Sequence, residues 1–317
     1  MDWIRRHIGM RTWKTAVGAA LAVFIAQSLN VSYAVNAGII VILSVQPTKR
    51  KSLDLAIMRI GSTILALAVG TLVFSTVGFT AVAFGLYLLI FIPIAVKLKF
   101  NDGIVPCSVL VSHLLAVKSV AIGWLGNEMM QMLIGAGIGF ILNLYMPSLE
   151  KMLEEDRLAI DDQIRHILDH MAECLRRQQP ELEEERYGQL AERLKIGFQR
   201  ALRDAENRMS RERTNHMRFM ELRNSQYEIL VHMRRYFKRL YMSYEQTHMV
   251  AELTDQVATH FTEHEQSDQV FDKINEYRST FKIMNLPATR EEFENRATLY
   301  EYINDLEHFL NLKNTIC

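Results

Sequence analysis

The chain has 317 residues, with 36 basic and 36 acidic side chains and only three cysteines. Residues 1–147 hold 11 Lys or Arg and 4 Asp or Glu, whereas residues 148–317 hold 25 and 32, so the net charge changes from +7 to −7 along the chain. The scattered cysteines show neither a disulfide framework nor metal-ligand spacing, and the acidic second half argues against nucleic-acid binding.

The two halves also differ in the arrangement of their apolar residues. Residues 1–147 are almost entirely apolar runs, whereas residues 148–317 are densely charged and keep apolar residues at helical spacing. Each half is long enough to fold as a unit. We therefore predict an all-α protein, with a six-helix transmembrane domain at residues 1–147 and a cytoplasmic α-helical domain at residues 148–317.

Six apolar stretches make up the first half. A helix that crosses a bilayer needs about 20 residues, so the second and fifth stretches must extend into their flanks or lie in a thinner bilayer. Pro93 and Pro106 can break their helices, and broken helices often line transporter cavities. The predicted spans are residues 13–29, 33–45, 55–77, 79–96, 104–117 and 122–146.

The orientation of these spans follows from Lys and Arg. Basic residues precede the first span and lie between spans two and three and between spans four and five, whereas the opposite loops carry only Lys118. The positive-inside rule therefore predicts a multi-pass protein of the cell membrane with both termini in the cytoplasm.

Four polar residues within the spans are candidates for a substrate pathway. Arg59 could extend to the cytoplasmic headgroups or could attract an anion at the inner mouth. His113 could be a neutral histidine that bonds a neighbouring helix, or a proton relay or substrate contact. For Glu128 we expect a hydrated carboxylate at the outer interface, with a buried carboxylate as the alternative. Asn36 can form hydrogen bonds between helices.

Small residues on the sixth stretch predict a helix-packing face. Gly135 and Gly139 are four residues apart, and this spacing lets two helices approach closely in a membrane. We expect the face to serve helix packing, and it is one of two reasons to expect a homodimer.

The second half reads as a bundle of four to six helices. Apolar and aromatic residues between positions 217 and 244 recur at three-, four- and seven-residue steps, which predicts one continuous helix. Pro287 should end another helix, and Thr289 with Glu292 reads as the capping box of the last helix. Thirteen basic residues lie between positions 193 and 239. We expect them to form ion pairs within the bundle, with anionic headgroups or gathered substrate anions as alternatives.

A resemblance to a known family rests on residues 45–70, VQPTKRKSLDLAIMRIGSTILALAVG. The pattern resembles the fusaric-acid-resistance-like membrane domain, in which a Pro ends the second span and an Arg followed by Gly and Ser or Thr opens the third. The whole layout is similar to the bacterial aromatic acid exporter family, and the plant aluminium-activated malate transporters share it. The residues that carry the motif are Pro47, Ser52, Arg59, Gly61, Thr63 and Gly70.

This resemblance implies export of small aromatic or organic acids. Longer members of the broad family carry the six-span unit twice, so a single unit implies a homodimer.

The sequence shows no nucleotide-binding loop, catalytic triad or redox pair. We therefore expect no enzyme activity, no cofactor and no metal. The prediction is a transporter that exports a small organic anion across the lipid bilayer, driven by the proton or voltage gradient. An anion channel and a membrane-anchored scaffold are the alternatives.

Overall fold

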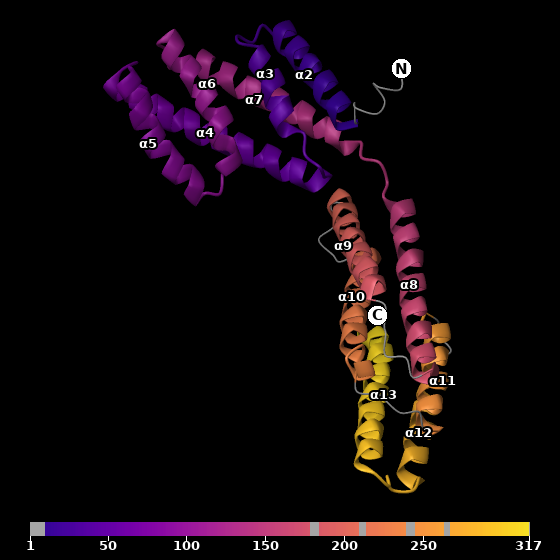
Figure 1. The fold of residues 1–317 in the computed structure, drawn as a ribbon. Helices are drawn as coiled ribbons and strands as arrows, with labels where there is room; N and C mark the ends of the chain where they lie inside the picture. Colours follow the sequence, from indigo (N-terminus) through magenta and orange to yellow (C-terminus); the bar gives the residue numbers. More distant parts are fainter. Residues whose placement is uncertain (1–9, 178–183, 209–213, 239–244, 263–266, 317) are drawn as a thin grey trace. The chain divides into compact units, whose positions relative to one another are not determined.

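The computed structural model describes residues 10–177, 184–208, 214–238, 245–262 and 267–316. Regular structure in these ranges is helical (Figure 1), and none of the described residues forms a strand. The predicted all-α class is therefore confirmed. By its contacts the chain divides into two compact units, residues 1–147 with 206–209, and residues 148–205 with 210–317.

The first unit is built around a short helix, α3, that packs against α2 and α7. The longer α4 packs against α5, α6 and α7. The helices of this unit are α2 (Met10–Ser28), α3 (Val35–Ser44), α4 (Lys49–Val77), α5 (Ala81–Lys97), the 3₁₀ turn η1 (Asn101–Gly103), α6 (Ile104–Val117) and α7 (Ile122–Leu144).

Two described helices, α4 and α7, are long and apolar enough to cross a membrane. Three shorter segments, α3, α5 and η1 with α6, are apolar as well. With 10 residues, α3 is about 15 Å long at 1.5 Å per residue, about half of the hydrocarbon thickness. The six-span layout therefore stays a prediction.

Side-chain caps explain where two of these helices begin. The hydroxyl of Thr48 accepts a hydrogen bond from the backbone N–H of Lys51 at the start of α4, and Thr80 accepts one from Ala83 at the start of α5. Such caps satisfy backbone donors that the first turn leaves unpaired. Neither Pro93, inside α5, nor Pro106, in the first turn of α6, divides its helix. The chain does leave helical structure between α2 and α3, at residues 29–34.

Gly135 and Gly139 lie where α7 approaches α3 most closely. A Cβ atom at Gly135 would lie 2.5 Å from the Cβ of Ile40 and 2.7 Å from the backbone oxygen of Ala37. A Cβ atom at Gly139 would lie 2.6 Å from the Cβ of Ser44. This face thus packs within the chain and no longer supports a homodimer, which stays a prediction.

We expect Gly135→Ala to destabilise the first unit by about 1–3 kcal/mol, because the added methyl group meets backbone and a β-branched side chain. Gly137→Ala is the matched control, since nothing lies within 4 Å of a Cβ atom at that position on the same helix. It should be neutral or stabilising by up to about 1 kcal/mol, because Ala favours a helix more than Gly does. Thermal unfolding of the two purified variants tests this, and equal melting temperatures would contradict the close approach.

The second unit has one hydrophobic core shared by six described helices. Within it, α8 packs against α11, and α10 packs against α13. The Thr289 cap predicted for the last helix is confirmed, because Glu292 N–H donates to Thr289 Oγ1 (3.1 Å). The Glu292 carboxylate accepts from Ala288 N–H (2.9 Å), one residue before the N–H that a capping box uses. The helices are α8 (Glu150–Arg177), α9 (Glu184–Asn207), α10 (Asn215–Met233), α11 (Glu245–His260), α12 (Ser267–Ile283) and α13 (Arg290–Ile316).

The predicted helix across residues 217–244 is wrong in its length. α10 ends at Met233, and a 3₁₀ turn, η2 (Tyr236–Lys238), follows it. The turn brings Tyr236 and Phe237 edge-on against the ring of Tyr302 in the core, and the Tyr236 hydroxyl bonds Asp305 on α13. Packing of these aromatic side chains has overridden the helical periodicity. Tyr241 and Tyr244 lie outside the described residues.

Several of the basic residues between positions 193 and 239 form ion pairs with acidic residues, as expected. Arg193 and Arg200 both contact Asp156, which is fully buried. Arg223 Nε lies 2.7 Å from Asp161 Oδ1. Burial raises the pKa of the Asp161 carboxyl, and the Arg223 guanidinium opposes this effect. Ion pairing thus accounts for the basic residues named here.

Candidate functional site

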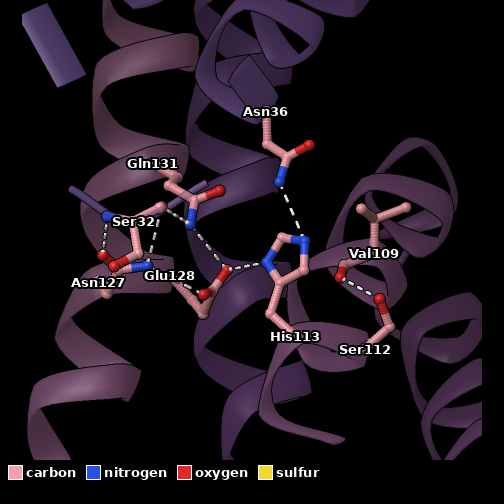
Figure 2. A network of polar contacts seen from close by, with 8 residues as sticks. All are labelled: Ser32, Asn36, Val109, Ser112, His113, Asn127, Glu128 and Gln131. Carbon is pink, nitrogen blue, oxygen red and sulfur yellow. Dashed lines mark hydrogen bonds and ion pairs between the residues drawn. The ribbon is translucent and has the colours of Figure 1, made fainter. Parts of the chain in front are cut away.

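Three of the four pathway candidates meet in the first unit, although they come from three different helices. His113 of α6 lies between Asn36 of α3 and Glu128 of α7 (Figure 2). Its Nδ1 is 2.8 Å from Glu128 Oε2, and its Nε2 is 3.0 Å from Asn36 Nδ2. The Glu128 side chain is fully buried, whereas that of His113 is 12% exposed.

The donors and acceptors of this group define its protonation. The Asn36 amide is placed with its nitrogen, which can only donate, toward the ring, and this placement assigns His113 Nε2 as the acceptor, without a proton. The proton of the neutral imidazole is then on Nδ1 and is donated to the Glu128 carboxylate. Glu128 also accepts from Gln131 Nε2 (3.1 Å) and Asn127 Nδ2 (3.0 Å). An ionised carboxylate with three donors is stable at a buried site because each bond is charge-assisted.

This group also holds the connector between α2 and α3, residues 29–34. Ser32 N–H donates to Asn127 Oδ1 (2.7 Å), and Ser32 O accepts from Gln131 Nε2 (3.0 Å) and Asn127 Nδ2 (3.2 Å). The ring of Tyr33 stacks on that of His113 with centroids 4.3 Å apart. Asn30 and Tyr33 adopt positive φ angles of 55° and 57°. A bulky residue in this region is strained, so the contacts hold an unfavourable backbone in place.

The expectation of a hydrated Glu128 is therefore wrong. Its predicted position, about one turn inside the outer interface, suggested contact with water, but the side chain is 0% exposed. The reason is that His113, Asn127 and Gln131 donate to its oxygens, and the two amides in turn bind the α2–α3 connector. The connector could not be deduced from spacing along the sequence, because Ser32 is 95 residues from Asn127 in the chain.

Arg59 occupies a second polar site, at the other end of α3. Its side chain is 3% exposed. Nη1 donates to Ser44 Oγ (2.5 Å) and to the carbonyl of Ile40 (3.3 Å), and Nη2 donates to the carbonyl of Leu43 (3.0 Å). The guanidinium thus caps the last turn of α3, a role that neither interpretation of the sequence foresaw. A role for Arg59 in attracting anions stays a prediction.

The two polar sites together match the dipole of α3. The partial positive charge of a helix N-terminus lies near Asn36, which His113 links to the carboxylate of Glu128, and the partial negative charge of the C-terminus lies at Arg59. A half-length helix with polar groups at both ends is a recurrent way of building ion and substrate sites in transporters. α3 is therefore the element on which both sites converge.

Other residues of the family motif pack around these sites. Thr63 Oγ1 donates to the Arg59 carbonyl (2.8 Å) and lies 3.3 Å from Cys107 Sγ. Ser52 Oγ accepts from the buried Asn143 (3.1 Å). A Cβ atom at Gly61 would touch the ring of Phe100, one at Gly70 would touch Val111, and Pro47 lies just before α4.

Comparisons with known proteins cover both units. The family model described as aromatic acid exporter family member 1 matches residues 6–146, and the putative aromatic acid exporter C-terminal domain matches residues 150–314. The chain belongs to the aromatic acid exporter family. The predicted resemblance to the aromatic acid exporter family is thus confirmed.

This exporter-family chain is also similar to a protein of Bacillus subtilis (strain 168), the uncharacterized protein YqjA. The two are 32% identical over 307 residues, which is 97% of this chain and 95% of that protein. Family membership implies a membrane exporter, and a transporter rather than an enzyme.

Proposed function

We propose that the protein exports small organic anions, preferably aromatic carboxylates, driven by the proton or voltage gradient across the cell membrane. The observation that carries the proposal is the pair of buried polar sites at the two ends of α3, in a unit whose other buried side chains are mainly apolar. Buried ionisable groups in an apolar membrane unit are costly, and they mark ion and substrate pathways.

The orientation predicted from Lys and Arg supports the direction of transport. With both termini in the cytoplasm, Arg59 lies toward the inner side and Glu128 toward the outer side. Exit of one anionic charge is favoured by ~2.3 kcal/mol per 100 mV of inside-negative potential. The voltage alone is therefore enough to drive export.

Efflux from proteoliposomes with a fixed inside-negative potential tests the class of substrate. We expect phthalate, an aromatic dicarboxylate, to leave faster than succinate, which has the same charge but no ring, and neutral phthalamide to leave no faster than from protein-free vesicles. Flux of all three at the protein-free rate would contradict the proposal and would favour a membrane-anchored scaffold.

A further inference from the structure

The strongest unassigned feature of the molecule is the pair formed by His113 and Glu128. In a low-dielectric unit, the pair in its present form carries a net charge of −1, because the imidazole is neutral and the carboxylate is ionised. Addition of one proton removes that net charge, and burial favours the uncharged form. The 12% exposure of the His113 side chain, against 0% for Glu128, makes the imidazole the route by which a proton reaches the carboxylate.

We infer that His113 and Glu128 form a proton-binding site whose occupancy controls the α2–α3 connector, residues 29–34. A proton arrives on His113 Nε2, and the Nδ1 proton passes to Glu128 Oε2. The pair has then gained one proton: the imidazole is neutral with its proton on Nε2, and the carboxyl is neutral. The inference deepens the proposed export function, on which its use in transport rests.

Two sets of contacts respond to this proton. Asn36 Nδ2, a donor, now faces another donor on Nε2, so the Asn36 amide must turn or separate from the ring. The neutral carboxyl is also a weaker acceptor than the carboxylate for the amides of Asn127 and Gln131. Those are the same amides that hold the backbone of Ser32. Protonation therefore weakens the hold on a connector in which the backbone of Tyr33 is already strained.

Other charged and titratable groups lie on the elements packed around the pair. Tyr33 stacks on the imidazole, Lys118 is the exposed C-cap of α6 five residues after His113, and Arg59 binds α3 one to two turns beyond Asn36. α3 contributes no titratable residue. The remaining titratable groups on the packed elements are Arg11 and Lys14 of α2, Lys49, Arg50, Lys51 and Asp54 of α4, Tyr87 and Lys97 of α5, Asp102 of η1, and Cys107 of α6.

Hydrogen–deuterium exchange of the full-length protein tests the inference without any substrate. Glu128→Gln mimics the neutral carboxyl, because an amide has one acceptor oxygen and cannot accept from donors on both sides. At a single pH near 8, we expect amides of residues 29–36 to exchange about tenfold faster in Glu128→Gln than in the wild type, the effect of losing about one net hydrogen bond. Asp102→Asn is the matched control, since it removes an exposed carboxylate of the same unit, and should exchange like the wild type.

The wild type should show the same change when the pH falls from about 8 to about 5, after correction for intrinsic exchange, because a lower pH favours the proton-bound pair. His113→Gln, which keeps a polar group but removes the imidazole proton, should lose most of this pH response, and it serves as the second variant if Glu128→Gln does not fold. Equal protection of residues 29–36 in the wild type at both pH values would overturn the inference. That result would leave the export proposal standing, whereas a failed flux assay would not affect the exchange data.

Discussion

Replacing Arg59 by Gln should destabilise the first unit by about 2–4 kcal/mol. The guanidinium is buried and donates to three acceptors in the last turn of α3. Bonds to a charged group are stronger than neutral ones, and buried acceptors that lose their donor are left without a hydrogen bond, since no water reaches them. Arg59→Lys should be intermediate, because an ammonium keeps the charge but cannot reach these acceptors with a planar fork. Thermal unfolding in detergent measures the difference.

Lys97→Gln is the control for this experiment, because Lys97 is an exposed cation in the last turn of α5. Its effect should stay within about 0.5 kcal/mol, as for most surface substitutions. If Arg59→Gln were as stable as Lys97→Gln, Arg59 would not hold α3. Flux per folded molecule tests the other role predicted for Arg59, which is contact with the substrate. If Arg59 has that role, the Gln variant should lose flux and the Lys variant should recover part of it.

Replacing Asp156 by Asn should destabilise the second unit by about 2–4 kcal/mol. We expect a value near the lower end of this range, because the two arginines that contact Asp156 are partly exposed. Asp156 is fully buried on α8, and its two oxygens accept from Arg200 Nη1 (2.6 Å) and Arg193 Nη1 (3.3 Å) of α9. The amide removes the charge that holds both arginines and presents a donor in place of one acceptor. Hydrogen–deuterium exchange of the full-length protein should show that the backbone amides of α8 and α9 lose protection in this variant.

The neighbouring Glu155 supplies the control for Asp156. Its carboxylate is 63% exposed and lies 4.0 Å from Lys151, so Glu155→Gln should change the stability by less than about 0.5 kcal/mol. Loss of protection that is equal in the two variants would mean that the buried ion pairs do not join α8 to α9.

Much of the fold could be predicted from the sequence because helical signals are local. Apolar spacing and charge identified an all-helical chain, and Thr289 with Glu292 located the start of α13 because a capping box involves only neighbouring residues. The helix across residues 217–244 could not be bounded in this way. The end of α10 depends on Tyr236 and Phe237 packing against Tyr302, which is about 65 residues further along the chain.

The candidate site was predictable only in part, for the same reason. Arg59, His113, Glu128 and Asn36 could be selected because polar residues are costly inside apolar segments. Their grouping could not, since it depends on how α3, α6 and α7 pack. Asn127, Gln131 and Ser32 were missed, although Asn127 and Gln131 are polar residues on the same helix as Glu128. Two further amides within one turn of an apolar helix are the signal that could have pointed to a buried carboxylate.

The central claim is that this chain alone moves organic anions across a bilayer in response to the electrical gradient. The most direct measurement is efflux of an aromatic carboxylate from wild-type proteoliposomes as the potential is stepped from 0 to about −100 mV inside, with protein-free vesicles alongside. Because each anionic charge gains ~2.3 kcal/mol at that potential, efflux through the protein should rise steeply. At equilibrium the outside-to-inside concentration ratio of the anion should be on the order of 50 per charge. Efflux that is independent of the potential, or equal to that of the protein-free vesicles, would contradict the claim.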